Sequence, residues 1–382
     1  MRQAFVNGRI LGASGFLADA TLVTQGESIE SLATAAAPLP AGTRRIDLAG
    51  RLLLPGFIDT QVNGGGGVLF NDEPTLEGIR AIGAAHRRFG TTGFLPTLIS
   101  DDLAVVARAI AAVEAAIRAG VPGVLGIHIE GPFLSEARKG VHDASRFREL
   151  DHDLLALLSS LKGGTTLVTL APEMATPSLL WRLTAAGVIL SAGHTDATYA
   201  EIESARQQGL RGYTHLFNAM SPLTGREPGV VGAALADPEG WCGIIVDGRH
   251  VDPVVLKIAL SAKRHDRFML VTDAMPCVGT DARSFQLQGR TITVQDGVCI
   301  DEQGTLAGTA LDMGRAVRNA VTLLGLEPAE AVRMASEYPA EFLRLGASRG
   351  RLAPGARADF VVADADLNVL ETWSGARQDP AG

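Results

Sequence analysis

Residues 124–133 read VLGIHIEGPF, and this stretch decides the fold. It begins as an unbroken apolar run, ends in His128 and Glu130, and is closed by Gly131 and Pro132. Residues 188–194, VILSAGH, repeat the pattern, because a largely apolar run again ends in a histidine. Such runs are typical of parallel strands that are buried on both faces. The two stretches therefore predict parallel strands with polar residues at their carboxyl ends.

The same kind of run recurs between residues 56 and 275, and helical stretches with apolar residues three and four apart separate several of the runs. The runs span residues 57–61, 92–97, 124–129, 166–170, 188–192, 212–215, 243–246 and 268–272, and the clearest helical stretches span 76–89, 103–119, 153–161, 197–209 and 253–263. Eight strand–helix units predict an α/β fold, a TIM-like (β/α)8 barrel. A doubly wound open sheet is the alternative, but it rarely needs eight repeats and would require a phosphate-binding fingerprint after its first strand.

The two ends of the chain differ from this pattern. Residues 1–54 show short strand-like segments with turns at Asn7-Gly8 and Gln25-Gly26, and residues 346–382 are again strand-like. We expect both ends to form one small β-sandwich domain beside a catalytic barrel of residues 55–345. Residues 276–307 predict a β-hairpin inserted after the eighth strand. An insertion at the carboxyl end of a barrel strand overhangs the active-site face, so this hairpin is a candidate lid.

The composition excludes several classes of protein. The 382 residues include 34 Lys+Arg and 42 Asp+Glu, a formal net charge of -8, which predicts binding to neither nucleic acid nor an anionic membrane. Hydrophobic residues make up 46%, enough for a large core. The three cysteines are far apart and odd in number, and the N-terminus lacks the apolar segment of a signal peptide. We therefore expect a cytoplasmic protein that acts on a small molecule.

Histidine and acidic residues gather just beyond the predicted strands. In chain order, the set is His128, Glu130, His142, His194, His215, His250 and Asp273. A single histidine at a strand end is more often a packing residue than a ligand, but barrel enzymes draw their catalytic residues from several strand ends. Glu130, His194 and His215 supply two imidazoles and a carboxylate with an open fourth position, as a catalytic Zn²⁺ site requires. Asp273 is then available to carry protons.

Longer motifs extend this pattern. They are PGFIDTQVNGGGG, GTTGFLPTLIS, GIHIEGPFLSEARKGVHD, LSAGHTDA, THLFNAMSPL, REPGVVGAAL, VDGRHV, LVTDAM, LAGTALDM and LAPGARADFVV. With these motifs the chain resembles the amidohydrolase superfamily and, within it, the family of N-acetylglucosamine-6-phosphate deacetylases. IHIEGPF together with THLFNAM is highly specific to that family among barrel hydrolases. The resemblance covers essentially the whole chain.

The resemblance implies metal-dependent hydrolysis of the acetamide of N-acetyl-D-glucosamine 6-phosphate. It implies metal ligation by Glu130, His194 and His215, and proton transfer by Asp273. It also implies a hydrogen bond from His142 to the acetyl carbonyl. The implied substrate contacts are Val141, His142, Asn218, Ala219, Arg226, Asp247, Gly248, Arg249, His250, Leu306, Ala307 and Gly308. One divalent ion is expected per chain, Zn²⁺ first and Fe²⁺, Co²⁺ or Mn²⁺ as alternatives. A homodimer or homotetramer is also implied.

The sequence offers candidate contacts for the phosphate and also bears on the class of substrate. The guanidinium fork of Arg226 and the backbone N–H groups of Asn218 and Ala219 suit a phosphate. A deacetylase for another amino sugar phosphate is one alternative. Departures from the family's motifs at Asn218, Arg226 or His250 would favour it, and the sequence shows none. A non-catalytic barrel of the same fold is a second alternative. Such proteins lose metal ligands or the base, whereas this chain keeps all of them.

The end of the first predicted strand departs from much of the superfamily. Many members carry His-x-His there and hold a second metal, whereas this sequence has Gln61-Val62-Asn63. Neutral amides are poor ligands for Zn²⁺ beside imidazole and carboxylate. We therefore expect one tightly held ion, with Gln61 hydrogen-bonding its water.

Overall fold

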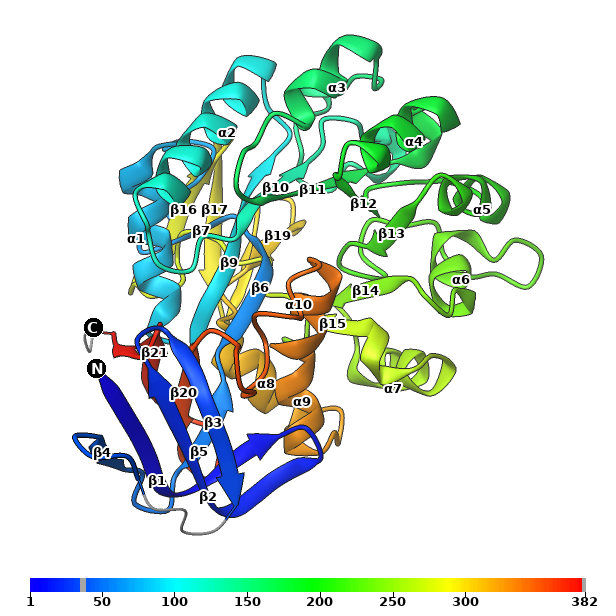
Figure 1. The fold of residues 1–382 in the computed structure, drawn as a ribbon. Coiled ribbons are helices and arrows are strands. Elements are labelled where there is room, and N and C mark those ends of the chain that lie inside the picture. Colours follow the sequence, from blue (N-terminus) through cyan, green and yellow to red (C-terminus); the bar gives the residue numbers. More distant parts are fainter. Residues whose placement is uncertain (35–38, 380–382) are drawn as a thin grey trace.

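Parallel strands form the centre of the molecule (Figure 1). The computed structural model describes residues 1–34 and 39–379, and within them eight strands form parallel ladders in the order β15-β14-β13-β12-β11-β10-β9-β6. Their bounds are β6 (Phe57–Val62), β9 (Thr91–Ile99), β10 (Gly126–Glu130), β11 (Thr165–Leu170), β12 (Ile189–Ala192), β13 (Leu210–Tyr213), β14 (Trp241–Ile244) and β15 (Phe268–Leu270). The predicted (β/α)8 barrel is confirmed.

The barrel closes between β6 and β15, where the ladder is interrupted. Val62 forms a parallel bridge with Ala274, and the N–H of Asn63 donates to the Ala274 carbonyl at 2.9 Å. A buried carboxylate also spans this seam, because the Thr272 hydroxyl donates to Asp59 Oδ2 at 2.5 Å. These contacts bring the carboxyl ends of the first and last strands to the same rim.

Helices cover the outside of the barrel (Figure 1). They are α1 (Leu76–Arg87), α2 (Leu103–Arg118), α3 (His152–Leu158), α4 (Pro177–Ala185), α5 (Tyr199–Gln207), α6 (Gly229–Ala236), α7 (Pro253–Ala262), α8 (Met313–Thr322), α9 (Pro328–Met334) and α10 (Glu337–Phe342). A capping box starts α5: Thr198 Oγ1 accepts from the N–H of Glu201, and the Glu201 carboxylate accepts from the N–H of Thr198. The predicted helices are confirmed to within a few residues, whereas α4, α6, α8, α9 and α10 lie outside the stretches picked out by periodicity.

A second sheet unites the two ends of the chain. Its order is β22-β21-β20-β5-β1-β2-β3, with β4 paired to β1. The bounds are β1 (Arg2–Gly12), β2 (Gly15–Gln25), β3 (Ser28–Thr34), β4 (Arg44–Asp47), β5 (Leu52–Pro55), β20 (Phe360–Ala363), β21 (Val369–Ser374) and β22 (Arg377–Gln378). It has its own core, in which the ring centroid of Phe5 lies 4.7 Å from Phe360 and 5.1 Å from Trp373. The predicted small β domain built from both termini is confirmed.

The predicted lid is larger than a single hairpin. Antiparallel pairing joins β16 (Ser284–Leu287), β17 (Arg290–Gln295), β18 (Val298–Ile300) and β19 (Leu306–Thr309) into one sheet. β19 returns to the barrel, where Thr309 bridges to Ala274 just beyond β15. Leu287 and Ile292 of this sheet share an apolar cluster with Ile99 from the end of β9. The insertion is thus anchored at the mouth of the barrel.

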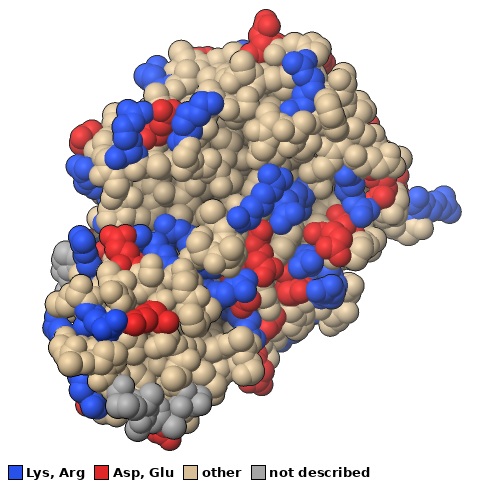
Figure 2. Space-filling view, in the orientation of Figure 1, with Lys and Arg blue, Asp and Glu red and all other residues tan. Residues whose placement is uncertain are grey.

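Charged residues of both signs are spread over the surface. On the face shown in Figure 2, the Lys and Arg side chains of the described residues lie among Asp and Glu rather than in one large patch of a single sign. Within residues 1–34 and 39–379, no helix combines the length and the apolar character that a membrane span needs.

Candidate active site

A cavity of about 380 Å³ opens at the carboxyl ends of the barrel strands, within the size range of small-molecule sites. Of the residues that the sequence predicts for the site, those lining it are Glu130, Val141, His142, His194, His215, Asn218, Ala219, His250, Asp273, Leu306, Ala307 and Gly308. Those outside its lining are Gln61, Arg226, Asp247, Gly248 and Arg249. Most of the predicted residues are therefore brought together in one cavity.

Three of the ionisable residues that line the cavity have a left-handed backbone. The φ angles of His194, His215 and Asp273 are 49°, 33° and 52°. Each residue follows closely on the last residue of its strand, β12, β13 or β15. A positive φ is costly for a residue with a side chain and is concentrated at functional sites. At these three residues the backbone leaves the strand conformation, and the side chain points into the mouth of the barrel.

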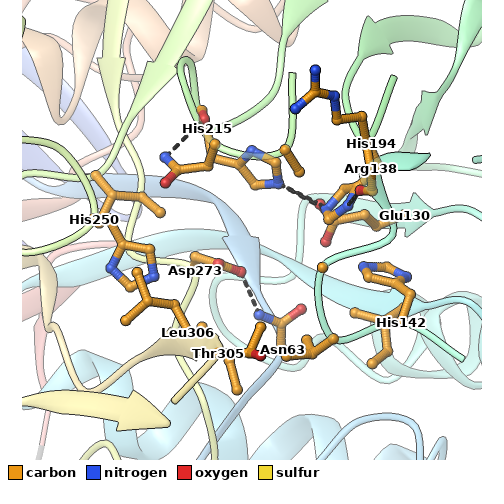
Figure 3. Close-up of a pocket in the computed structure, with 18 of the residues that line it drawn as sticks. Asn63, Glu130, Arg138, His142, His194, His215, His250, Asp273, Thr305 and Leu306 are labelled. Carbon is orange, nitrogen blue, oxygen red and sulfur yellow. Dashed lines mark hydrogen bonds and ion pairs between the residues drawn. The ribbon is translucent and has the colours of Figure 1, made fainter. Parts of the chain in front are cut away.

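Glu130, His194 and His215 meet on one side of the cavity (Figure 3). His215 Nε2 lies 3.0 Å from Glu130 Oε1 and 3.1 Å from His194 Nε2, and His194 Nε2 lies 3.4 Å from Glu130 Oε1. The other ring nitrogen of His194, Nδ1, lies 2.9 Å from the carbonyl oxygen of Arg138. A carbonyl only accepts, so Nδ1 carries the proton and Nε2 offers its lone pair to the group.

This donor set fits a divalent metal ion. Ligand atoms bound tetrahedrally at about 2.0–2.1 Å lie about 3.3 Å apart, close to the three distances given above. All three residues are buried, and their ligand atoms lie within 4.8 Å of one another. Burial alone would raise the pKa of Glu130, but the hydrogen bonds and charges of His194 and His215 hold that pKa well below its usual value. A buried carboxylate facing two ring nitrogens is an arrangement that a cation stabilises.

Asp273 lies beside this group and is held by two amides. Its Oδ1 accepts from Asn63 Nδ2 at 2.7 Å and from Gln61 Nε2 at 3.1 Å. The Gln61 amide also contacts Glu130 Oε1 at 3.2 Å, so it ties the two carboxylates together. Burial, followed by the charge of Glu130, raises the pKa of Asp273. A carboxylate with a raised pKa suits a group that takes up and returns a proton.

His142 flanks the same group, with its ring centroid 4.4 Å from that of His194. Burial lowers the pKa of His142 to about 3, so the ring is neutral at neutral pH. Its Nδ1 lies 2.8 Å from Ser100 Oγ. A neutral ring carries a single N–H, and that group can donate to a carbonyl oxygen in the cavity.

His128 does not join the cavity. Its Nδ1 lies 3.1 Å from Thr97 Oγ1 and its Nε2 lies 2.7 Å from Thr169 Oγ1, inside the barrel. Burial lowers the pKa of His128 to about 4. Residues two apart on a strand point the same way, so His128 lies one layer below Glu130. Its grouping with the residues at the mouth is wrong, and it is a hydrogen-bonded packing residue.

His250 lines the side of the cavity that faces away from His142 (Figure 3). Its Nδ1 donates to Asp247 Oδ2 at 2.6 Å, and Asp247 Oδ1 accepts from the N–H groups of Arg249 and His250. Burial would raise the pKa of Asp247, but the hydrogen bond and charge of His250 lower it. Asp247 thus orients His250 and does not line the cavity itself.

The predicted phosphate contacts are only partly in place. The backbone N–H of Asn218 donates to the His215 carbonyl at 3.0 Å, and the Asn218 side-chain amide contacts the same oxygen at 3.0 Å. The expectation that this N–H faces an anion is therefore wrong. The N–H of Ala219 meets no acceptor among the described residues. Arg226 is exposed in the loop before α6 and lies outside the cavity lining.

Several lining residues are not singled out for the site by the sequence. They are Asn63, Ile99, Ala137, Arg138, Gly140, Ile245, Met275, Leu287 and Thr305. The place of Asn63 at the end of the first predicted strand is the one signal that could have found it. Leu287 and Thr305 come from the insertion, and their position depends on how that sheet folds back onto the barrel.

Comparisons with known proteins agree with this geometry. The model of the amidohydrolase family matches residues 52–380. The N-acetylgalactosamine-6-phosphate deacetylase of Shewanella sp. (strain ANA-3) is 47% identical over 322 residues, 84% of this chain and 81% of the relative. The N-acetylglucosamine-6-phosphate deacetylase of Haemophilus influenzae is 36% identical over 375 residues, 97% of this chain and 98% of the relative. The crystal structure of N-acetylglucosamine-6-phosphate deacetylase from Pasteurella multocida superposes with a TM-score of 0.95 at 35% identity, covering 99% of this chain and 100% of that one.

Proposed function

The chain belongs to the amidohydrolase family, and from this premise we propose that it hydrolyses the acetamide of N-acetyl-D-glucosamine 6-phosphate, giving D-glucosamine 6-phosphate and acetate. The observation that carries the proposal is the group of Glu130, His194 and His215 beside Asp273 and a neutral His142, all lining one cavity. Relatives that cover almost the whole chain carry the same activity in their names.

Glu130, His194 and His215 would hold one divalent ion, with Zn²⁺ as the first expectation and Fe²⁺, Co²⁺ or Mn²⁺ as alternatives. When bound there, such an ion supplies Lewis acidity and makes water a stronger acid. Gln61 and Asn63 donate their amide protons to Asp273 and Glu130, and as neutral amides they are poor ligands for a second Zn²⁺. This arrangement supports a site for one ion.

Asp273 and His142 divide the remaining chemistry. Asp273 holds the attacking water and takes its proton while the bond from water oxygen to acetyl carbon forms. It then returns the proton to the amide nitrogen, so that the C–N bond breaks with a neutral amine as leaving group. His142 donates a hydrogen bond to the acetyl oxygen, on which negative charge develops.

The sugar phosphate would lie between the metal-binding group and His250, with its phosphate toward the N–H of Ala219. Val141 and the segment Leu306–Gly308 line the cavity and supply contacts to the sugar. Arg226 suits the phosphate through its planar donor fork. Because Arg226 is exposed and outside the lining, it reaches the phosphate only when its loop closes or a second copy of the chain supplies it.

A homodimer or homotetramer is part of this proposal. Val254 and Ile258 lie four residues apart on α7 and are 62% and 61% exposed, so they form an apolar strip on one face of that helix, as contact surfaces do. Three buried cysteines without disulfides support a reducing, cytoplasmic location. Light scattering coupled to size-exclusion chromatography tests the assembly, and a monomer at every concentration would contradict it.

N-acetyl-D-galactosamine 6-phosphate is a second candidate substrate, because a relative with that name is 47% identical to this chain. Acetate release from both sugar phosphates by the purified protein decides between them, with metal content measured before chelation and after Zn²⁺ is added back. We expect the larger kcat/KM for the glucosamine derivative, and the opposite preference would select the second candidate. Absence of release from both, in metal-loaded protein, would contradict the proposed function.

A further inference from the structure

Ser100 lies directly behind the His142 ring. It is the first residue after β9 and is fully buried. Its hydroxyl lies 2.8 Å from His142 Nδ1, and its backbone N–H donates to the same nitrogen at 3.4 Å. A backbone N–H can only donate, so Nδ1 is the acceptor and the single proton of the neutral ring resides on Nε2. Ser100 thus selects the tautomer in which Nε2, rather than Nδ1, is the donor.

Gln288 holds Ser100 and the His142 loop together. It lies at the turn between β16 and β17 of the lid, with a φ of 49°. Its Nε2 donates to the Ser100 carbonyl at 2.7 Å, and its Oε1 accepts from the N–H of Asp143 at 3.1 Å. Both partners are backbone groups with fixed roles, so only one orientation of the amide satisfies them. One side chain of the lid therefore spans the two segments that flank the His142 ring.

We propose that Ser100 and Gln288 are positioning residues that keep His142 in its Nε2–H tautomer and aimed into the cavity. The proposal rests on the proposed function, in which His142 donates to the acetyl oxygen. It assigns the lid a part in the chemistry that goes beyond covering the cavity: Gln288 fixes Ser100, and Ser100 fixes the imidazole. Neither residue lines the cavity, so neither touches the substrate.

Gly131 shows that this contact has shaped the neighbouring backbone. It has a φ of 83°, and a Cβ at this position would collide with Ser100 Oγ and with the Leu134 side chain. The glycine that follows Glu130 thus leaves room for the serine hydroxyl behind His142.

An exposed ion pair offers a matched control. Arg146 pairs with Asp102, and so joins the loop after β9 to the loop that carries His142. The Arg146 side chain is 38% exposed, and within the described part of the chain its ion pairs are with Asp102 and Asp143. Arg146→Ala therefore loosens the same two segments without removing the hydrogen bonds to His142. Exposed pairs of this kind contribute little to stability.

The decisive experiment is a double-mutant cycle on the metal-loaded protein, with N-acetyl-D-glucosamine 6-phosphate as substrate. Ser100→Ala should lower kcat about tenfold, and Gln288→Met by a few-fold, while metal content and KM change little. In a His142→Asn background, both substitutions should have almost no further effect, because their target is gone. Arg146→Ala should leave kcat near the parent value in both backgrounds. An equal loss in both backgrounds, or a kcat for Ser100→Ala within twofold of the parent, would overturn the proposal.

A spectroscopic measurement separates this proposal from the proposed function. Protein labelled with ¹⁵N-histidine contains eight histidines, and the signals of His142 are those lost in His142→Asn. Long-range ¹H–¹⁵N correlations should show the Nε2–H tautomer in the parent and a mixture of the two tautomers in Ser100→Ala, where the 2.8 Å hydroxyl contact is lost and only the longer backbone contact of 3.4 Å remains. If Ser100→Ala does not fold, the same spectrum is recorded for Gln288→Met, which changes a residue in a half-buried turn, and the same shift in tautomer is expected. An unchanged tautomer would overturn the positioning role even in a protein without deacetylase activity, whereas a changed tautomer in an inactive protein would contradict only the proposed function.

Discussion

The floor of the cavity and its rim are built in different ways. Glu130, His194 and His215 on the floor are buried, lie at the end of a barrel strand or two residues beyond it, and contact one another. The rim consists of the loops and turns that follow the barrel strands, and it carries the exposed Arg226 in the loop before α6 and Gln288 in a turn of the lid. Strand ladders fix the floor before any substrate binds, whereas loops and turns place the rim. The groups that carry out the reaction therefore belong to the floor, whereas on the rim Arg226 serves recognition and Gln288 positions a reacting group from outside the cavity.

The largest effect is expected at the metal-binding group. Glu130→Ala, His194→Ala or His215→Ala removes one of the three ligands, so both the bound ion and the activity should be lost. Elemental analysis of the parent should find about one divalent ion per chain, and each variant should be nearly metal-free. The matched rim variant, Arg226→Ala, should keep its ion. Two fully occupied ions in the parent, or an ion held by Glu130→Ala with parental affinity, would contradict this assignment.

The next effect is expected at the proton carrier. Asp273→Asn keeps an oxygen for the Asn63 and Gln61 amides but cannot carry a proton, so kcat should fall by about 10²–10⁴ while the ion stays bound. Steady-state kinetics and metal analysis of the same sample check this. Asp252→Asn, at the exposed N-cap of α7, makes the same substitution outside the cavity lining and should have little effect. If Asp273→Asn turned over within a few-fold of the parent with full metal content, another group would have to move the proton.

Much of the floor could be predicted from the sequence because it depends on local patterns. Continuous apolar runs mark the barrel strands, and residues at the end of a run or within two residues beyond it face the mouth. His194, His215 and Asp273 all follow this rule. His128 breaks it for a physical reason: its strand continues for two more residues to Glu130, so the histidine remains inside the barrel. The amino-acid sequence alone does not show which residue forms the last hydrogen bond between neighbouring strands.

The rim could be predicted only in part because it depends on contacts between distant segments. Ser100 and Gln288 are 188 residues apart in the chain and meet only because the insertion folds back over β9. The Asn218 N–H donates to the His215 carbonyl because the chain makes a tight turn after His215, and no sequence motif predicts that turn. Even the extent of the insertion was underestimated, since β19 pairs with β18 and extends the predicted hairpin to a larger sheet.

A further effect is expected beneath the floor, at Asp59 in the seam of the barrel. Its Oδ1 accepts from the N–H groups of Gln61 and Thr272, and burial raises its pKa to about 7. The usual pKa of an aspartate is about 3.9, so the folded state holds a proton that the unfolded state has released between about pH 4 and pH 7. Stability must therefore fall as pH rises through this range, by about 4 kcal/mol in all.

Asp59→Asn removes this titration. Its Oδ1 can still accept from both N–H groups, and its amide can donate to Thr272 Oγ1. The free energy of unfolding of the variant, relative to that of the parent, should therefore increase from pH 4.5 to pH 7.5. Urea unfolding of both proteins at the two pH values measures this difference. A difference that stays constant between the two pH values would contradict the prediction.

The smallest effect is expected on the rim, at Arg226. A charge-assisted hydrogen bond to a phosphate contributes about 1.5–3 kcal/mol, so Arg226→Ala should lower kcat/KM for N-acetyl-D-glucosamine 6-phosphate by roughly 10- to 150-fold. Most of the loss should be in KM, because the phosphate is bound equally before and during the reaction. Unphosphorylated N-acetyl-D-glucosamine serves as the internal control, and its slow turnover should hardly change. Arg226→Lys should recover part of the loss, since it restores the charge without the fork. Equal losses on both substrates, or a loss in kcat alone, would place Arg226 with the floor and remove the distinction between the two regions.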